Sequence, residues 1–423
     1  MKFNKWTIGL AAVGVVSMAS VASAEEKMNA VQTALSSTTI SGYVDTSAQW
    51  NPGTGNMNVP AYKFNSSSKA DGFNLDVVDI KIAKPLDEGQ WSAGYNVDLL
   101  YGPDANVYGT SSTGINTSDF AIRQAYVSLR APLGNGLDFK MGVFDSIIGY
   151  ESFESGNDPN YTRSYGNTIE PQTHTGVLAT YRFCDWFAAS AGVADTVGPT
   201  IDQRNFVVTG YGVGSAESYK TYMGSIALTA PDSMGFLAGS SLYAGVVNGF
   251  NANVPGPLVG TANQTSWYAG ATLKTPVTGL VVGLAYDYLG ISHQPLTGAV
   301  NGAAGQSAYA NSIAGYLSYQ ATEKLSFHLR EEYFTMTGQF PDPMGLGNSI
   351  GAPGLPTRVL ATTATIQYDL WQNVISRLEF RWDHQADGTG YAYGATTTPT
   401  ASNPLGGTRR NAYMMALNVI YKF

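Results

Sequence analysis

Polar and apolar residues alternate along most of this chain with a period of two, which is the spacing of a strand with one buried face. In the stretch 89–101, small and polar residues alternate with Trp91, Ala93, Tyr95, Val97, Leu99 and Tyr101. The pattern predicts sixteen strands, at about 38–50, 73–84, 89–101, 119–131, 136–145, 173–183, 186–194, 218–230, 236–248, 265–274, 280–289, 308–320, 324–336, 358–369, 373–384 and 409–423. Merging or splitting a weak segment, such as 186–194, would give about fourteen or eighteen strands.

The connections between these strands alternate strictly between short and long. The short ones are 85–89, 131–135, 184–185, 231–235, 275–279, 321–323 and 370–372. The long ones are 51–72, 102–118, 146–172, 195–217, 249–264, 290–307, 337–357 and 385–408. An antiparallel membrane barrel has this pattern, because its periplasmic turns are short and its outer loops are long. A soluble β-sandwich has no reason to produce it.

The last strand carries an apolar stripe and ends in an aromatic residue. Its alternate positions are Tyr413, Met415, Leu417, Val419, Tyr421 and Phe423. Outer-membrane barrels of Gram-negative bacteria end in such a tail, so we expect Tyr421 and Phe423 to act as the assembly signal. A strand edge left unpaired in lipid cannot satisfy its backbone groups, so the sheet must close. The sequence therefore predicts an all-β protein, a closed antiparallel transmembrane barrel of about 16 strands in the bacterial outer membrane.

The first residues have the features of a secretory signal peptide. Two lysines precede the apolar run 6–16, and the small residues at 22–24 predict cleavage before Glu25. A membrane anchor is the alternative, but the run is shorter than the ~18 apolar residues that would span a bilayer. The segment after the cleavage site is expected to be one or two helical turns or to be disordered. We therefore divide the chain into signal peptide, short periplasmic leader and barrel, at 1–24, 25–37 and 38–423.

Composition agrees with a barrel that encloses water. Charged residues make up 13% of the chain and aromatic residues 12%, yet the mean hydropathy is only -0.08, because lipid-facing and lumen-facing residues alternate. A barrel of about 16 strands is wide enough for an aqueous channel. The net charge of -8 becomes -10 when the two lysines of the signal peptide are removed, which argues against nucleic-acid partners. Cys184 is the only cysteine, so no internal disulfide forms.

The third outer loop, 146–172, is richer in charged and aromatic residues than the other loops. Its charged residues include Glu151, Glu154, Asp158 and Arg163. In general porins the third outer loop folds inward and narrows the pore, and we expect the same here. A solvated surface loop is the alternative.

The inward positions of two late strands are unusually charged. Apolar residues on the opposite face assign to the lumen Lys324, His328, Arg330, Glu332, Arg377, Glu379, Arg381 and Asp383. Arg123 and Lys140 are further candidates on early strands. Basic groups facing an acidic loop would set a transverse field in a constriction and select solutes by charge. The alternative is a static ladder of salt bridges that only satisfies buried charges.

Three stretches resemble one family of outer-membrane proteins. They are Gly142-x-Phe144 through Gly149-x-Glu151 with Asn160-Tyr161-Thr162-Arg163-Ser164, then Arg123 to Val127, and Arg377 to Asp383. Together they resemble the OmpL-like barrel-porin family over residues 39–423, although that family usually has Ser where Thr162 stands. The resemblance implies an outer-membrane diffusion channel for small hydrophilic solutes or ions. It also implies contact with outer-membrane lipid, lipopolysaccharide and the barrel-assembly machinery, and names no solute.

Other classes of function find little support in the residues. The four histidines are scattered and no nucleophile motif surrounds them, at His174, His293, His328 and His384. We therefore predict no enzyme, no cofactor and no metal site, although calcium held by loop carboxylates is left open. A non-conducting structural or adhesin-type barrel is the alternative to a channel. Porins of this size are often trimers, so a homotrimer is left open as well.

Overall fold

The computed structural model describes residues 31–32, 37–53, 56–111, 118–205, 218–250, 263–292, 307–337, 356–388 and 390–423. The predicted signal peptide 1–24, most of the leader 25–37 and His293 lie outside the described residues. Within the leader, the two-residue strand β1 (Val31–Gln32) pairs with Thr39 and Ile40. This part of the leader therefore extends the sheet and does not form the helical turns that were one of the two expectations.

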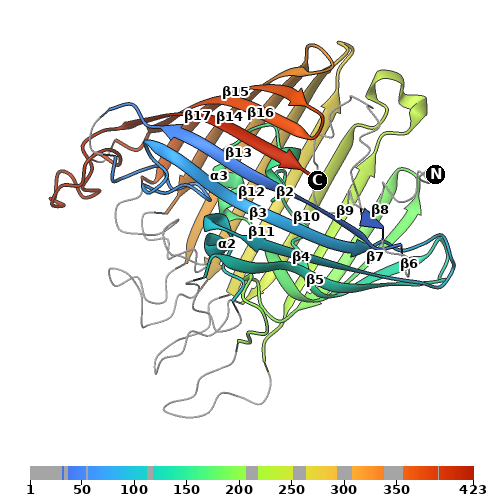
Figure 1. Ribbon diagram of the computed structural model, residues 1–423. Helices are drawn as coiled ribbons and strands as arrows, with labels where there is room; N and C mark the ends of the chain where they lie inside the picture. The colour runs from blue at the N-terminus through green and yellow to red at the C-terminus, as the bar shows by residue number, and fades with distance from the viewer. Residues whose placement is uncertain are drawn as a thin grey trace.

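Sixteen antiparallel strands, β2 to β17, form one closed barrel (Figure 1). Each strand pairs with the next along the chain, and β17 pairs with β2 to close the sheet. The strands are β2 Thr39–Trp50, β3 Gly72–Lys84, β4 Ser92–Tyr101, β5 Phe120–Ala131, β6 Leu137–Asp145, β7 Thr173–Cys184, β8 Phe187–Ala194, β9 Thr221–Thr229, β10 Ser241–Phe250, β11 Asn263–Lys274, β12 Leu280–Ser292, β13 Ala308–Gln320, β14 Leu325–Met336, β15 Arg358–Trp371, β16 Val374–Gln385 and β17 Asn411–Lys422. The predicted fold and all sixteen predicted strands are confirmed, with ends that differ by a few residues.

Burial follows the predicted alternation. On β17, Tyr413, Leu417 and Tyr421 are exposed on the outer surface, whereas Met414, Ala416 and Ile420 are buried inside. The chain end adds one further pair, because Phe423 and Gly42 exchange two backbone hydrogen bonds of 2.9 and 3.0 Å. Among the described helices, none is long and apolar enough to cross a membrane.

At two of the places where the register of the sheet shifts, a β-bulge turns an extra side chain inward. Between β4 and β5, Asp98 pairs with Gln124 and Leu99 pairs with Ile122, so Arg123 is the extra residue. Asp76 is the extra residue of a second bulge, between β2 and β3. A bulge lets two successive side chains point to the same face, and Arg123 and Gln124 are accordingly both buried. The alternation alone therefore could not show whether Arg123 faces the lumen or the lipid.

The interior of the barrel contains the loop 146–172, with the short helix α3 (Tyr165–Ile169) (Figure 1). Two apolar clusters attach it to the wall. One joins loop residues such as Ile148 and Tyr150 to inward residues of β10 to β13. The other joins Tyr165 and Ile169 of α3 to inward residues of β12 to β15. The loop is thus packed against the sheet and does not lie on the outer surface.

Candidate functional site

The loop 146–172 has a regular internal structure of its own. Its ends meet where the backbone N–H of Ser146 donates to the carbonyl of Gln172 at 2.7 Å. The 3-10 turn η1 (Ser155–Asn157) lies in its first half. The side chain of Ser164 caps α3 by accepting from the backbone N–H of Asn167 at 2.9 Å, a role for which serine is well suited. These contacts give the loop a defined path across the interior.

Three buried arginines of the wall donate hydrogen bonds to the loop. Arg330 on β14 donates to the carbonyl of Thr162 at 2.7 Å and forms an ion pair of 2.7 Å with Glu151. Arg377 on β16 donates to the carbonyls of Ser155 at 2.8 Å and Asp158 at 2.6 Å.

Arg381, also on β16, completes this set. It donates to the carbonyl of Arg163 at 2.7 Å and pairs with Asp383 through two contacts of 2.9 Å. Guanidinium groups suit this task, because several fixed N–H donors can satisfy several acceptors at once. The three arginines therefore hold the loop by its backbone.

Carboxylates of the same wall accept hydrogen bonds from loop N–H groups. Glu379 accepts from the backbone N–H groups of Tyr161 at 2.6 Å and Thr162 at 2.9 Å. Glu332 accepts from the N–H of Tyr165 at the start of α3, at 2.6 and 2.7 Å. An irregular loop inside a barrel must satisfy its backbone groups without a sheet partner. Here, charged side chains of β14 and β16 satisfy both its donors and its acceptors.

The opposite side of the loop contacts early strands through Arg123. This guanidinium bonds Asp98 at 2.9 Å and Glu154 at 2.7 Å, and also pairs with Asp145. Burial raises the pKa of Glu154, but Arg123 and Lys81 outweigh it and lower that pKa to about 2. The Glu154 carboxylate is therefore ionised at neutral pH.

The structure brings all nine predicted pore residues into this contact between loop and wall. They are Glu151, Glu154, Asp158, Arg163, Arg330, Arg377, Glu379, Arg381 and Asp383. Eight are buried, and only the side chain of Glu154 keeps substantial exposure, at 23%. The expected arrangement had basic and acidic groups facing each other across water, whereas Arg330 and Glu151 touch directly. This geometry is closer to the alternative of a salt-bridge network, and a role of these residues in selecting solutes stays a prediction.

The other predicted candidates have different surroundings. His328 is half-buried between the hydroxyls of Ser318 and Ser326. Lys140 is half-buried and its ammonium lies 4.8 Å from the centre of the Tyr126 ring. Lys324 is exposed in the turn before β14. None of these three contacts the loop 146–172 through a hydrogen bond or ion pair within the described residues.

Sequence reasoning missed the first outer loop, 51–72. Tyr62 lies under Arg381, whose guanidinium carbon is 3.6 Å from the ring centre. The backbone N–H of Lys63 donates to the Thr168 hydroxyl at 2.9 Å. Lys69 pairs with Asp76 at 2.6 Å and with Asp104 at 2.8 Å. The run Tyr62-Lys63-Phe64, aromatic and basic within a polar loop, was the available signal for an inward path.

Comparison with known proteins places this barrel among porins. The family model described as "Putative beta-barrel porin-2, OmpL-like" matches residues 37–423. The outer membrane channel DcaP of Acinetobacter baumannii superposes with a TM-score of 0.57 at 12% identity, over 93% of this chain and 99% of that one. An anion-selective porin from Comamonas acidovorans gives 0.56 at 12% identity, over 91% and 99%.

A third similar structure is the trimer form of OmpT, an outer membrane protein of Vibrio cholerae. It gives a TM-score of 0.52 at 11% identity, over 91% of this chain and 99% of that one. No curated protein sequence matches the chain significantly. At these identities, the likeness to the three solved structures shows the fold alone.

Proposed function

We propose, from the premise that the chain belongs to the OmpL-like family of β-barrel porins, that its third outer loop sets the width and selectivity of the channel. The protein is a porin of the bacterial outer membrane. Its solutes are then small hydrophilic molecules or ions that diffuse passively through the barrel. The proposal assigns the chain no catalytic step and no cofactor.

One observation carries the proposal, namely the attachment of the loop 146–172 inside the barrel by charged side chains. Arg377 and Glu379 bond both carbonyl and N–H groups of its backbone, and Arg123 bonds Glu154 on the other side. A loop attached at both sides has a fixed position and narrows the bore. The charges nearest the remaining water, such as Glu154, would then act on passing ions in a medium of low effective dielectric.

Single-channel recording in planar bilayers tests the proposal. The purified protein should conduct ions in stable steps. A variant in which residues 152–163 are replaced by a short Gly-Ser linker should conduct with larger steps, because the bore widens. Deletion of 396–404, mostly exposed residues of the last outer loop, is the matched control and should leave the step size unchanged.

The close packing of the loop favours one alternative, a barrel that does not conduct. Absence of steps at both polarities in the wild-type protein, together with normal membrane insertion, would establish that alternative. Equal step sizes in the wild type and the 152–163 variant would instead place the narrowest point elsewhere.

We also propose a homotrimer. The support is the trimer form of the similar OmpT structure. Chemical cross-linking in native outer membranes tests it, and a ladder that stops at three chains is the expected result. A single monomer band after efficient cross-linking would contradict it.

A further inference from the structure

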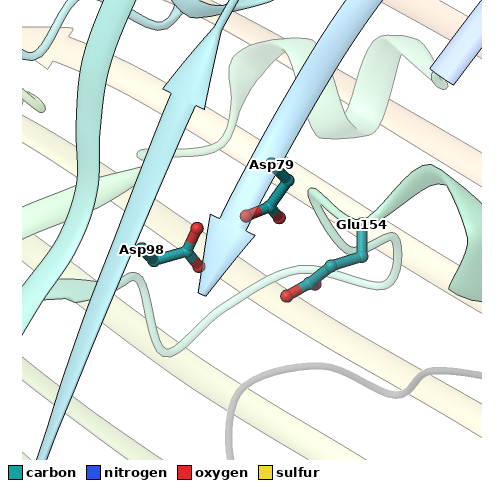
Figure 2. Close-up of side chains that lie close together, drawn as sticks. All are labelled: Asp79, Asp98 and Glu154. Atoms are coloured by element: carbon teal, nitrogen blue, oxygen red, sulfur yellow. The ribbon is translucent and has the colours of Figure 1, made fainter. Parts of the chain in front are cut away.

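Three carboxylates from distant parts of the chain meet at the inner face of β3 and β4. They belong to Asp79 on β3, Asp98 on β4 and Glu154 on the loop 146–172. One oxygen of each lies within 4.8 Å of the others. Figure 2 shows the carboxylates of Asp79 and Asp98 turned toward one another, with Glu154 extending toward them from the loop. Like charges at this separation repel strongly unless something lies between them.

Buried oxygen atoms around this cluster lack partners. Asp79 is 2% exposed and Asp98 is not exposed at all, and the Oδ1 atom of each accepts no hydrogen bond from the described residues. Tyr43 stands opposite Asp79 in the register of β2 and β3, and its buried hydroxyl also lacks a partner there. A buried polar atom without a partner costs about 1–3 kcal/mol, and more when it is charged. A bound cation or a shared proton would satisfy such oxygen atoms.

The fixed charges at this place do not balance. Arg123 is bonded to Asp98, Asp145 and Glu154, and the Lys81 ammonium is 3.8 Å from Glu154. The two cations are the guanidinium of Arg123 and the ammonium of Lys81. They face four carboxylates, namely those three and Asp79. Lys140 lies over the Tyr126 ring, and among the described residues neither Lys140 nor Lys63 forms an ion pair with these carboxylates.

Arg123 leaves one oxygen of Asp98 free and bonds one oxygen of Glu154 only over a long distance. It contacts Oδ2 of Asp98 at 2.9 Å, so Oδ1 stays available. On Glu154 it donates to Oε1 at 2.7 Å and, over the longer distance of 3.4 Å, to Oε2. A metal ion and the guanidinium can therefore bind these two carboxylates together.

We infer that Asp79, Asp98 and Glu154 form a binding site for one Ca²⁺ ion, which ties the loop 146–172 to β3 and β4. Calcium takes oxygen ligands at ~2.3–2.6 Å, so two ligands on opposite sides of it are ~4.6–5.2 Å apart. Because the three oxygen atoms lie within 4.8 Å of one another, a single ion of this size can contact all three carboxylates. Magnesium usually keeps several of its own waters and binds only one or two carboxylates, so a set of three carboxylates favours calcium. Water molecules would complete the coordination shell.

The competing explanation is a proton shared between Asp79 and Asp98. A carboxylic acid bonded to a carboxylate also relieves the repulsion. It leaves Glu154 outside the arrangement and requires no metal. Calcium binding distinguishes the two explanations directly, and it does so whether or not the barrel conducts.

Isothermal titration calorimetry with CaCl₂ on the full-length, detergent-solubilised barrel, stripped with EDTA, tests the inference. One Ca²⁺ should bind per chain at neutral pH. Asp79→Asn and Glu154→Gln should each lose this binding. Asp138→Asn is the matched control, because Asp138 is a buried carboxylate on β6 that is paired with Arg130 outside the cluster, and it should bind Ca²⁺ as the wild type does. Heat-modifiable gel mobility reports whether each variant is folded.

Terbium provides a second measurement on the same proteins. Tb³⁺ replaces Ca²⁺ at oxygen sites, and its luminescence is excited through a nearby tyrosine such as Tyr43. Emission that Ca²⁺ displaces, and that Asp79→Asn lacks, is the expected result. A folded wild-type barrel that takes up no Ca²⁺ at ~1 mM, the weak end of known extracellular sites, would overturn the inference and leave the shared proton. Undiminished binding in folded Asp79→Asn and Glu154→Gln would overturn it too.

Discussion

At the scale of single residues, charged side chains of β14 and β16 form hydrogen bonds with the backbone of the loop 146–172. Arg377 bonds two loop carbonyls and Glu379 bonds two loop N–H groups. The sequence indicated the inward face of these residues, because Leu378 and Phe380 between them are apolar and face lipid. Their hydrogen-bond partners could not be predicted. Almost every residue has the same backbone groups, so the sequence does not show which of them a side chain will bond.

Replacing Arg377 and Arg381 together with Ala should loosen the loop and shift selectivity toward cations. The loop carbonyls of Ser155, Asp158 and Arg163 would lose donors, at about 1–3 kcal/mol for each one left buried and unpaired. Two positive charges would also be lost, and the shift should be larger at low salt. Reversal potentials in a salt gradient and the frequency of spontaneous closures measure both effects. Leu378→Ala is the lipid-facing control. Unchanged potentials and steady openings in the double variant would contradict the expectation.

Selectivity should also depend on pH near neutrality through Lys63. Burial lowers the pKa of its ammonium to about 7, although Glu170 acts in the opposite direction. The positive charge is therefore lost as pH rises through about 7, and the channel should become more cation-selective. Burial also raises the pKa of Asp158 to about 7, and its ionisation shifts selectivity in the same direction.

Lys63→Met should consequently remove part of this pH dependence, measured as reversal potentials between about pH 6 and 8. Lys324→Met, in an exposed turn, should keep the wild-type profile. The lowered pKa of Lys63 also makes the stability of the folded protein depend on pH, in a direction that can be stated. Because the pKa in the folded protein lies below the ordinary 10.5, the contribution of Lys63 to stability rises with pH between the two values. Identical pH profiles in the wild type and Lys63→Met would refute this assignment.

At the scale of elements, strands were predictable and irregular segments were not. Each strand has one face in lipid, so period-two alternation marks it along its whole length. The bulge at Arg123 and the inward path of 51–72 break or lack that period, and they depend on contacts between distant segments. The third outer loop was predictable as an inward loop only by analogy with porins, whereas its attachment through Arg330, Arg377 and Arg381 required the structure.

Deleting Phe423 should impair membrane assembly. Phe423 forms the last backbone pair between the two ends of the sheet, with Gly42. A Cβ atom on Gly42 would lie 2.8 Å from its ring, so the ring packs closely on the first barrel strand. Heat-modifiable mobility of protein in the outer-membrane fraction measures assembly. Phe423→Tyr keeps the aromatic ring and is the control that should assemble normally. Normal amounts of folded protein after the deletion would show that the terminal residue is dispensable.

At the scale of the whole molecule, we expect export and membrane insertion to be two separate steps. We expect the predicted signal peptide 1–24 to direct export, and the barrel then to enter the outer membrane. Mass spectrometry of the mature protein should give an N-terminus at Glu25, because small residues at positions 22 and 24 suit signal peptidase. Ala24→Arg should block that cleavage, whereas Glu25→Gln, just beyond the site, should not. A mature mass that includes residues 1–24 would contradict the prediction.

The closure of the sheet fixes the order of events in biogenesis. β17 pairs with β2, and the loop 146–172 bonds residues of β14 and β16 that follow it by roughly two hundred positions. Contacts of such long range form late and slowly. The barrel cannot close until β17 has been synthesised and inserted. The loop 146–172 cannot form its bonds to Arg377 and Glu379 until β16 is in place. A barrel that still lacks β16 would therefore carry the loop 146–172 without two of the side chains that hold it in position, Arg377 and Glu379.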